Sequence, residues 1–192
     1  MDESFCRIES LPNARILRLC SEDGTNRLTR RCVAALTETI NLLAQQALPV
    51  IITGNERFFS AGADLNEIAA LDGPTAYEFG KLGQSLMASV EDFPAPVIAA
   101  LSGYCMGGGL DLALACRRRI ASPHAIFGHR GAALGLITGW GGTQRLPRLL
   151  GKGRALEMFV AAEKVHAQRA LQIGLIDEIC EDPVAGAIHR LS

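Results

Sequence analysis

The stretch PVIAALSGYCMGGGLDLALAC, residues 96–116, contains a short apolar run, a glycine loop and an apolar helical pattern in direct succession. Residues 96–101 hold no polar side chain, which is typical of a strand that is buried on both faces. Consecutive glycines at residues 107–109 then precede a helix expected from Gly108 to Cys116. A strand, a loop and a helix in this order indicate one unit of an α/β fold.

The preceding segments repeat the same order. A strand is expected at residues 14–20, a helix follows it, and PVIIT at residues 49–53 forms the next strand. A second helix at residues 75–92 then leads to the strand at residues 96–101. The apolar stripes of the two helices are Val33, Leu36, Ile40 and Leu43 in the first, and Phe79, Leu82, Leu86 and Val90 in the second. These repeats predict an α/β fold with right-handed crossovers.

Weaker patterns complete the chain, which we interpret as one domain over residues 1–192 because it contains no linker or low-complexity segment. The expected elements are strands near residues 119–121 and 125–127, helices from Gly153 and from Ala167, and a last strand at residues 175–179.

The composition argues against several classes of partner. Hydrophobic residues make up 48% of the chain and the formal net charge is −1, so neither nucleic acid nor a membrane surface is indicated. The start, MDESFCRIES, is acidic where a secretory signal is basic, and no apolar run reaches the roughly 20 residues of a membrane span. We therefore expect a cytoplasmic protein. Six cysteines stand far apart without a CxxC pair, which predicts reduced, buried thiols and no metal site.

Two glycine loops follow two of the expected strands, at TGNERFFSAGADL and LSGYCMGGGLDLA. Ligands bind at the carboxyl ends of strands in α/β folds, and glycine lets the backbone approach them closely. The backbone N–H groups of Ala63 and Gly108 would then converge as an oxyanion hole, because the first turn of a helix leaves its donors unpaired. The alternative is that both loops only make tight turns. Neither loop has a GxGxxG or GxxxxGK[ST] pattern, so nucleotide binding is not indicated.

Four motifs stand in the order FFSAGADLNEI (58–68), PVIAALSGYCMGGGLDLALAC (96–116), FGHRGAALGLITGWGGTQRLPRLLGKGRALEM (127–158) and AQRALQIGLIDEI (167–179). Together they resemble the enoyl-CoA hydratase/isomerase family, the crotonases. The resemblance implies a spiral core of repeated ββα units and an acyl-CoA thioester substrate of fatty acid metabolism, with no covalently bound cofactor. It also implies a homotrimer or hexamer. Family members usually continue with further helices, so the C-terminal helical part is expected to be shortened here.

The resemblance also assigns roles to individual residues. Ala63 and Gly108 match the two backbone donors that hold the thioester oxygen in the family, and Asp111 matches the first of two catalytic glutamates. Contacts to substrate and CoA are implied for Ser60, Ala61, Ala63, Asp64, Leu65, Gly107, Gly108 and Gly131.

The second catalytic glutamate of family hydratases is missing, because its position falls on Gly131. Gly139 likewise stands where dienoyl-CoA isomerases carry an aspartate. A positioned acid or base usually contributes about 10²–10⁴-fold to the rate, and a misplacement of about 1 Å can cost about 10²-fold. Because Asp111 is also one methylene shorter than glutamate, we do not expect efficient hydration. The space beside Gly131 could hold an anion, a water or a carboxylate of the substrate.

Asp111 has two interpretations. It either stabilises the start of its helix, which would keep it ionised near neutrality, or it acts as a base or a water-orienting group. For its neighbours the alternatives are similar. His129 either titrates near pH 7 or is structural, and Arg130 either pairs with a carboxylated substrate or lies in solvent. Trp140 is expected to pack under its loop. The basic residues Arg117, Arg118, Arg119, Arg145, Arg148 and Lys152 are expected on solvated faces or subunit contacts.

Three hypotheses about function remain at this point. The first is an enoyl-CoA hydratase or isomerase that uses Ala63, Gly108 and Asp111. The second is a decarboxylase or hydrolase that uses the same oxyanion hole. The third is a non-catalytic acyl-CoA-binding or assembly protein.

Overall fold

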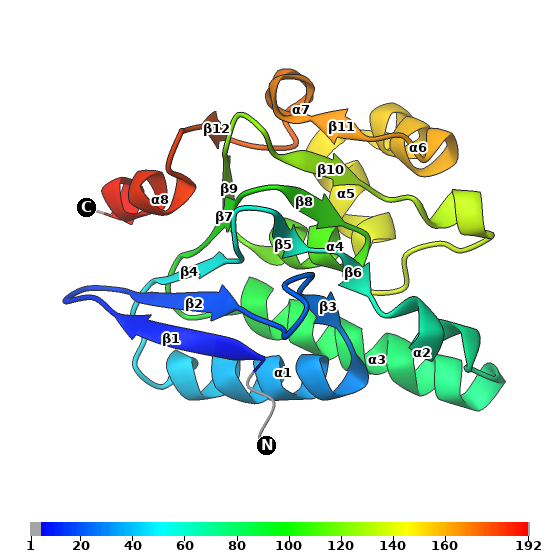
Figure 1. Ribbon diagram of the computed structural model, residues 1–192, viewed down its shortest axis with the longest axis horizontal. Helices are drawn as coiled ribbons and strands as arrows, with labels where there is room; N and C mark the ends of the chain where they lie inside the picture. The colour runs from blue at the N-terminus through cyan, green and yellow to red at the C-terminus, as the bar shows by residue number, and fades with distance from the viewer. Residues whose placement is uncertain (1–4, 192) are drawn as a thin grey trace.

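The computed structural model describes residues 5–191, and its largest sheet has six strands (Figure 1). Residues 1–4, part of the acidic start, and residue 192 lie outside the described part. The strand order is β1-β2-β4-β7-β9-β12, with β1 antiparallel to β2 and the other neighbours parallel. The strands are β1 (Cys6–Ser10), β2 (Arg15–Leu19), β4 (Val50–Thr53), β7 (Val97–Leu101), β9 (Arg118–Ala121) and β12 (Glu178–Ile179).

The central strands β4 and β7 are buried along their whole length because both faces of the sheet are covered. Successive side chains of a strand point to opposite faces. Ile52 and Ala99 therefore join the main core, while Ile51 and Ile98 join a smaller cluster that packs against α8 (Pro183–Leu191).

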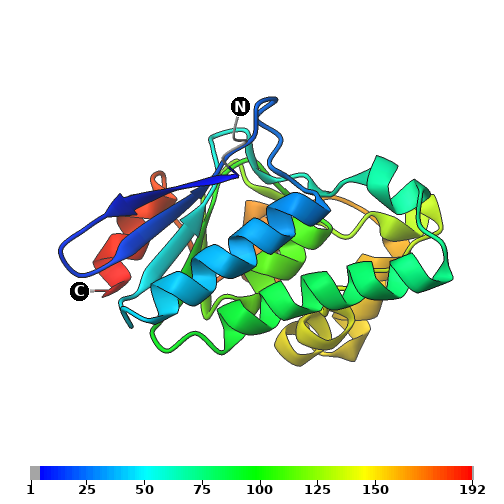
Figure 2. The ribbon, with the colours of Figure 1, turned by 90° about the horizontal axis from the view of Figure 1, so that it is seen from below.

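Two long helices, α1 (Arg30–Ala44) and α3 (Gly73–Glu91), lie side by side on the main-core side of the sheet (Figure 2). The predicted stripe of α1 is fully buried. In α3 the stripe is buried except for Leu82, which is half-buried. This helix begins before the predicted residue 75, because Asp72 and Thr75 form a reciprocal capping box.

A second sheet and a short strand pair connect the six-stranded sheet to the helices that follow. The strand order of the second sheet is β11-β10-β8-β5, and the separate strand pair consists of β3 and β6. These strands are β3 (Arg27–Leu28), β5 (Phe58–Ser60), β6 (Gly62–Ala63), β8 (Tyr104–Met106), β10 (Ile126–Gly128) and β11 (Val165–His166). Helix α4 (Gly108–Ala115) follows β8 and is buried on all sides, as its small and apolar residues allow.

The last third of the chain differs most from the predictions. Helix α5 precedes the helix predicted from Gly153, and we did not expect it because it starts with glycine and contains Pro147. The strand predicted at residues 175–179 shortens to β12. The remaining helices are α2 (Leu65–Ala69), η1 (Gly131–Leu134), α5 (Gly142–Leu150), α6 (Lys152–Ala161) and α7 (Ala167–Ile173).

Candidate active site

The two glycine loops meet at the start of α4. A Cβ on Gly62 would lie 3.2 Å from the backbone nitrogen of Gly108, and a Cβ on Gly108 would lie 3.4 Å from the nitrogen of Ala63. The backbones around Ala63 and Gly108 are therefore in van der Waals contact. Gly107, with φ +50° and ψ −119°, makes the turn that allows this approach, and other residues rarely adopt such a positive φ.

Gly108 is the first residue of α4, so its N–H belongs to the donors that have no partner within a helix. Ala63 and Gly108 both line the same cavity. This arrangement has the form of an oxyanion hole, in which preorganised donors stabilise negative charge on an oxygen.

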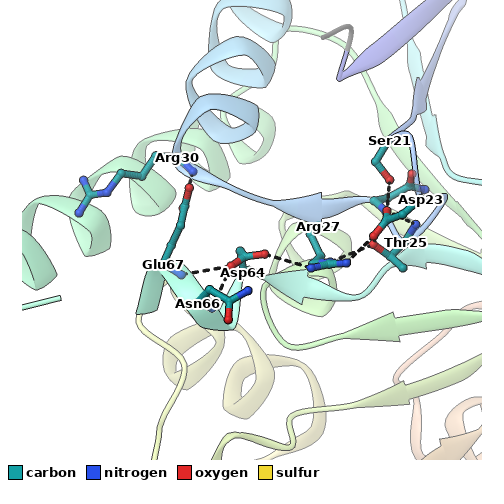
Figure 3. A network of polar contacts seen from close by, with 9 residues as sticks. Ser21, Asp23, Thr25, Arg27, Arg30, Asp64, Asn66 and Glu67 are labelled. Atoms are coloured by element: carbon teal, nitrogen blue, oxygen red, sulfur yellow. Dashed lines mark hydrogen bonds and ion pairs between the residues drawn. The ribbon is translucent and has the colours of Figure 1, made fainter. Parts of the chain in front are cut away.

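A polar network holds the first of the two loops (Figure 3). Asp64 caps α2 by accepting from the backbone of Asn66 and Glu67, and it pairs with Arg27 at 3.3 Å. Arg27 also pairs with Asp23, and Glu67 accepts a 2.8 Å hydrogen bond from the backbone of Arg30. The network fixes β6 against β3, because Arg27 is also the strand partner of Gly62.

A cavity of about 680 Å³ opens beside this junction. Apolar side chains from α2, α3, the η1 loop and α6 form most of its wall, and the polar side chains in the wall are Asp111, His129, Arg130 and Thr138. Of the predicted binding residues, the cavity is lined by Ala61, Ala63, Leu65, Gly107, Gly108 and Gly131.

Two predicted binding residues, Ser60 and Asp64, lie behind the cavity wall. The Ser60 hydroxyl is fully buried, where it donates to the backbone oxygen of Asn26 at 2.7 Å and accepts from Gly62 at 3.1 Å. Asp64 is occupied as the cap of α2. Both side chains shape the loop from the side that faces away from the cavity.

Asp111 lies in the first turn of α4 and is 1% exposed. Thr138 donates a short hydrogen bond to its Oδ2, and its Oδ1 lies 3.4 Å from His129 Nε2. Burial raises the pKa of Asp111 to about 7, although Thr138 and Arg145 act in the opposite direction. The interpretation in which Asp111 stays fully ionised near neutrality is not supported, because burial outweighs the hydrogen bond from Thr138 and the charge of Arg145.

His129 follows β10 and is 4% exposed, with its ring 5.2 Å from that of Phe159. Burial lowers the pKa of His129 to about 4, which favours the structural interpretation of His129 over titration near pH 7. At neutral pH its imidazole is uncharged and faces a carboxyl group whose pKa lies near that pH, so that both the acid and the carboxylate of Asp111 are populated.

The surroundings of Asp111 and Gly131 are tight on the side away from the cavity. A Cβ on Gly142 would lie 2.2 Å from Asp111 Oδ1, so glycine at this position leaves room for the Asp111 carboxyl. A Cβ on Gly131 would lie 2.7 Å from the backbone oxygen of Leu136, so a glutamate there would require the loop to shift.

The outcomes for the other named residues are mixed. Trp140 packs under its loop as predicted, is 4% exposed and donates to the backbone oxygen of Phe79 at 3.1 Å. Arg119 does not lie on a solvated face: it is 5% exposed and bonds the backbone of Cys116 and Leu175 as well as Asp177. Arg117, Arg118, Arg148 and Lys152 are exposed, and Arg145 pairs with Glu91.

Thr138 is a cavity residue that the sequence analysis missed. It is the single hydroxyl residue between Gly131 and Gly142, which is the signal that could have identified it. Its contact with Asp111, 27 residues earlier, depends on how the loop folds back over α4.

The chain matches the family model "Enoyl-CoA hydratase/isomerase" over residues 16–187, and it belongs to this family. Its fold is the crotonase fold: a crystal structure of enoyl-CoA hydratase from Bacillus anthracis matches with TM-score 0.92 and 34% identity, covering 98% of this chain and 75% of that one. Relative to that structure, the chain is shorter.

Curated relatives agree with this assignment. The chain is 42% identical over 154 residues to a "Probable enoyl-CoA hydratase" of Bacillus subtilis, a match that takes in 79% of this chain and 60% of the relative. It is 43% identical over 133 residues to a "Crotonyl-CoA hydratase" of Syntrophomonas wolfei, covering 69% of this chain and 51% of the relative. The matches thus span between half and 60% of these relatives.

Within residues 5–191, no helix is long and apolar enough to cross a membrane.

Proposed function

We propose that the protein acts on an unsaturated acyl-CoA thioester and moves a proton at the carbon next to the thioester. The N–H groups of Ala63 and Gly108 would hold the thioester oxygen, and the carboxyl of Asp111 would transfer the proton. The observation that carries this proposal is Asp111 itself, a carboxyl with a pKa of about 7 three residues after Gly108 and beside the same cavity. Such a group can both donate and accept a proton near neutral pH.

Double-bond migration is the reaction that this site supports best. One acid–base group can remove a proton from C2 of a 3-enoyl thioester and return it to C4, which gives the 2-enoyl isomer. The intermediate is an enolate, and one donor to such an oxygen is typically worth about 10²–10³-fold in rate.

Hydration of a 2-enoyl thioester is the second candidate, and the printed names of the relatives favour it. It requires a proton to leave water and another to reach C2, a task for which Gly131 contributes no side chain. We therefore expect hydration to be slower than isomerisation.

A homotrimer or hexamer, acting on acyl-CoA without a bound cofactor, remains part of the proposal. Family membership supports it, as do the exposed apolar side chains of Ile137, Leu156 and Val160 at the rim of the cavity.

The test is a panel of 3-hexenoyl-, crotonyl-, dienoyl- and methylmalonyl-CoA, with products separated by chromatography and identified by mass spectrometry. We expect 2-hexenoyl-CoA from the wild type, a loss of about 10²-fold or more in kcat for Asp111→Asn, and a similar loss for Gly108→Ala. Gly153→Ala is the control, because a Cβ there meets no atom within 4 Å.

Two outcomes would contradict the proposal. If the wild type binds the thioesters but forms no product from any of them, the protein is a binder. If methylmalonyl-CoA is turned over and the activity survives Asp111→Asn, the site is a decarboxylase or hydrolase.

A further inference from the structure

Three polar side chains from separate segments meet at one wall of the cavity. Asp111 comes from α4, His129 follows β10, and Thr138 lies between η1 and α5. Thr138 donates to Asp111 Oδ2, and Asp111 Oδ1 lies 3.4 Å from His129 Nε2. In the described structure Asp111 Oδ1 and His129 Nε2 are shielded from solvent and have no hydrogen-bond partner. Each of these two atoms is therefore a candidate hydrogen-bond partner for the other.

We propose that Thr138, Asp111 and His129 form one proton relay, in which the Thr138 hydroxyl exchanges protons with the substrate and His129 stores the proton. The inference rests on the proposed function, because it explains how a buried Asp111 could act on a substrate in the cavity. Thr138 would be a catalytic residue, and His129 would act through Asp111.

The exposure of the three side chains to the cavity determines the order in which they pass the proton. Asp111 and His129 line the cavity wall but are 1% and 4% exposed, whereas Thr138 is half-buried and keeps accessible surface. A proton that leaves the substrate therefore reaches the Thr138 hydroxyl first. Gly142 closes the opposite side, since a Cβ there would lie 2.2 Å from Asp111 Oδ1 and 3.1 Å from His129 Cε1.

Burial, against the effect of the nearest charge, favours a neutral resting state. Arg145 on α5 lowers the pKa of Asp111 and so favours its carboxylate, but burial has the larger effect, and α6 contributes the uncharged ring of Phe159 against His129. Burial disfavours both carboxylate and imidazolium, so near neutral pH a substantial share of the molecules holds Asp111 as a carboxylic acid beside a neutral His129 imidazole, and this neutral pair is the resting state of the relay. One proton then lies between two heavy atoms that are 3.4 Å apart.

The proton transfer balances without any further reactant. When the C2–H bond of an acyl thioester breaks, its electron pair forms the enolate held by Ala63 and Gly108. The proton passes to Thr138 Oγ1, the hydroxyl proton of Thr138 passes to Asp111 Oδ2, and the proton on Oδ1 passes to His129 Nε2. Asp111 stays neutral and His129 becomes an imidazolium. The reverse sequence returns a proton to carbon and restores the resting state.

The experiment measures exchange of the C2 hydrogens of butyryl-CoA in D₂O by mass spectrometry, which requires proton transfer but no double bond. We expect Thr138→Val and His129→Gln each to lower the exchange rate about 10²-fold, with the Kd of butyryl-CoA unchanged. Thr138→Ser should recover most of the rate because it restores the hydroxyl.

Matched controls lie close in the chain. Thr143→Val removes a hydroxyl and His124→Gln replaces an exposed histidine, and neither residue lines this cavity. Both should exchange at the wild-type rate. Circular dichroism and thermal unfolding of every variant show whether a loss of exchange comes from unfolding.

Two results would overturn the relay while leaving the proposed function intact. Wild-type exchange in Thr138→Val excludes the hydroxyl as the route, and wild-type exchange in His129→Gln excludes His129 as the store.

A readout that needs no turnover separates the two proposals. Nitrogen-15 NMR of labelled histidine should show His129 Nε2 accepting a hydrogen bond, and Asp111→Asn should shift this signal but not that of His124. If butyryl-CoA binds but its C2 hydrogens do not exchange, the proposed function fails. If, in addition, the His129 Nε2 signal is the same in Asp111→Asn as in the wild type, the relay is overturned as well.

Discussion

Asp111 and His129 show how strongly a residue's surroundings control its chemistry. Both are polar groups that lose nearly all contact with water, and burial favours the neutral form of each. A neutral carboxyl is a proton donor, which is the opposite of the role of a free aspartate at pH 7, while a neutral imidazole is a proton acceptor as it is in free solution at that pH. The pair therefore supplies an acid and a base although the site contains one carboxyl group.

Asp111 and His129 should give protein stability opposite dependences on pH. Folding raises the pKa of Asp111 from 3.8 to about 7, so its contribution is complete below about pH 4 and is lost as the pH rises towards 7. Folding lowers the pKa of His129 from 6.5 to about 4, so its contribution is complete above about pH 6.5 and is lost as the pH falls towards 4. In the wild type the two slopes largely cancel.

Single variants should reveal how each residue makes the free energy of unfolding depend on pH, as measured by urea unfolding at pH 4.5, 5.5 and 6.5. In Asp111→Asn the free energy of unfolding should rise with pH across this range relative to the wild type. In His129→Gln it should fall, by at most about 3 kcal/mol over these two pH units. Slopes of the same sign in both variants would show that the pair is not neutral.

At the scale of elements, the packing of α3 against α4 positions the glycine loop at the start of α4. Trp140 lies between the helices. A Cβ on Gly83 of α3 would lie 2.2 Å from the Trp140 ring, and a Cβ on Gly108 of α4 would lie 2.5 Å from it. Glycine at both positions lets the indole ring fill the space between the two helices. The hydrogen bond from Trp140 to Phe79 then fixes the ring against α3.

We predict that Gly83→Ala lowers the free energy of unfolding by about 1–3 kcal/mol, because the new methyl group overpacks against the Trp140 ring. Gly80→Ala on the same helix is the control, since a Cβ there meets no atom within 4 Å. It should leave stability unchanged or raise it by up to about 1 kcal/mol. Equal effects in the two variants would contradict the close contact with Trp140.

At the scale of the whole molecule, the burial of the cysteine side chains shows which of them belong to the main core. The prediction of buried thiols holds for Cys32, Cys105 and Cys116, while Cys6, Cys20 and Cys180 are partly exposed. None of the six forms a disulfide. Burial raises the pKa of Cys32 and of Cys116 to about 12, and raises that of Cys105 as well.

Labelling with a thiol reagent at pH 8 should therefore occur in two phases. The three partly exposed thiols should react first, and the three core thiols only at the rate at which the molecule unfolds, because thiolate is the reactive form and the core excludes the reagent. Mass spectrometry of the labelled peptides assigns the phases, and Cys180→Ser should remove one fast site. Rapid labelling of Cys116 in folded protein would contradict the buried position of α4.

Local patterns account for the parts of the structure that were predicted correctly. The apolar runs of β4 and β7 and the stripes of α1 and α3 are properties of neighbouring residues, so periodicity alone identifies them. The glycine loops are local as well, because a positive φ at Gly62 and Gly107 needs a residue without Cβ. The two-residue strand β6 was missed because it forms only against β3, and α5 was missed because it starts with glycine and contains Pro147.

The sequence by itself determined the family, the order of the main elements, and the positions of Ala63, Gly108, Asp111 and the missing acid at Gly131. Tertiary structure alone decided the protonation of Asp111 and His129, the contact with Thr138, and the burial of Arg119. The physical reason is that propensity and spacing act between residues near in the chain. Desolvation and hydrogen bonding depend on which distant segments exclude water from a group, and that is settled only when the loop after β10 folds back onto α4.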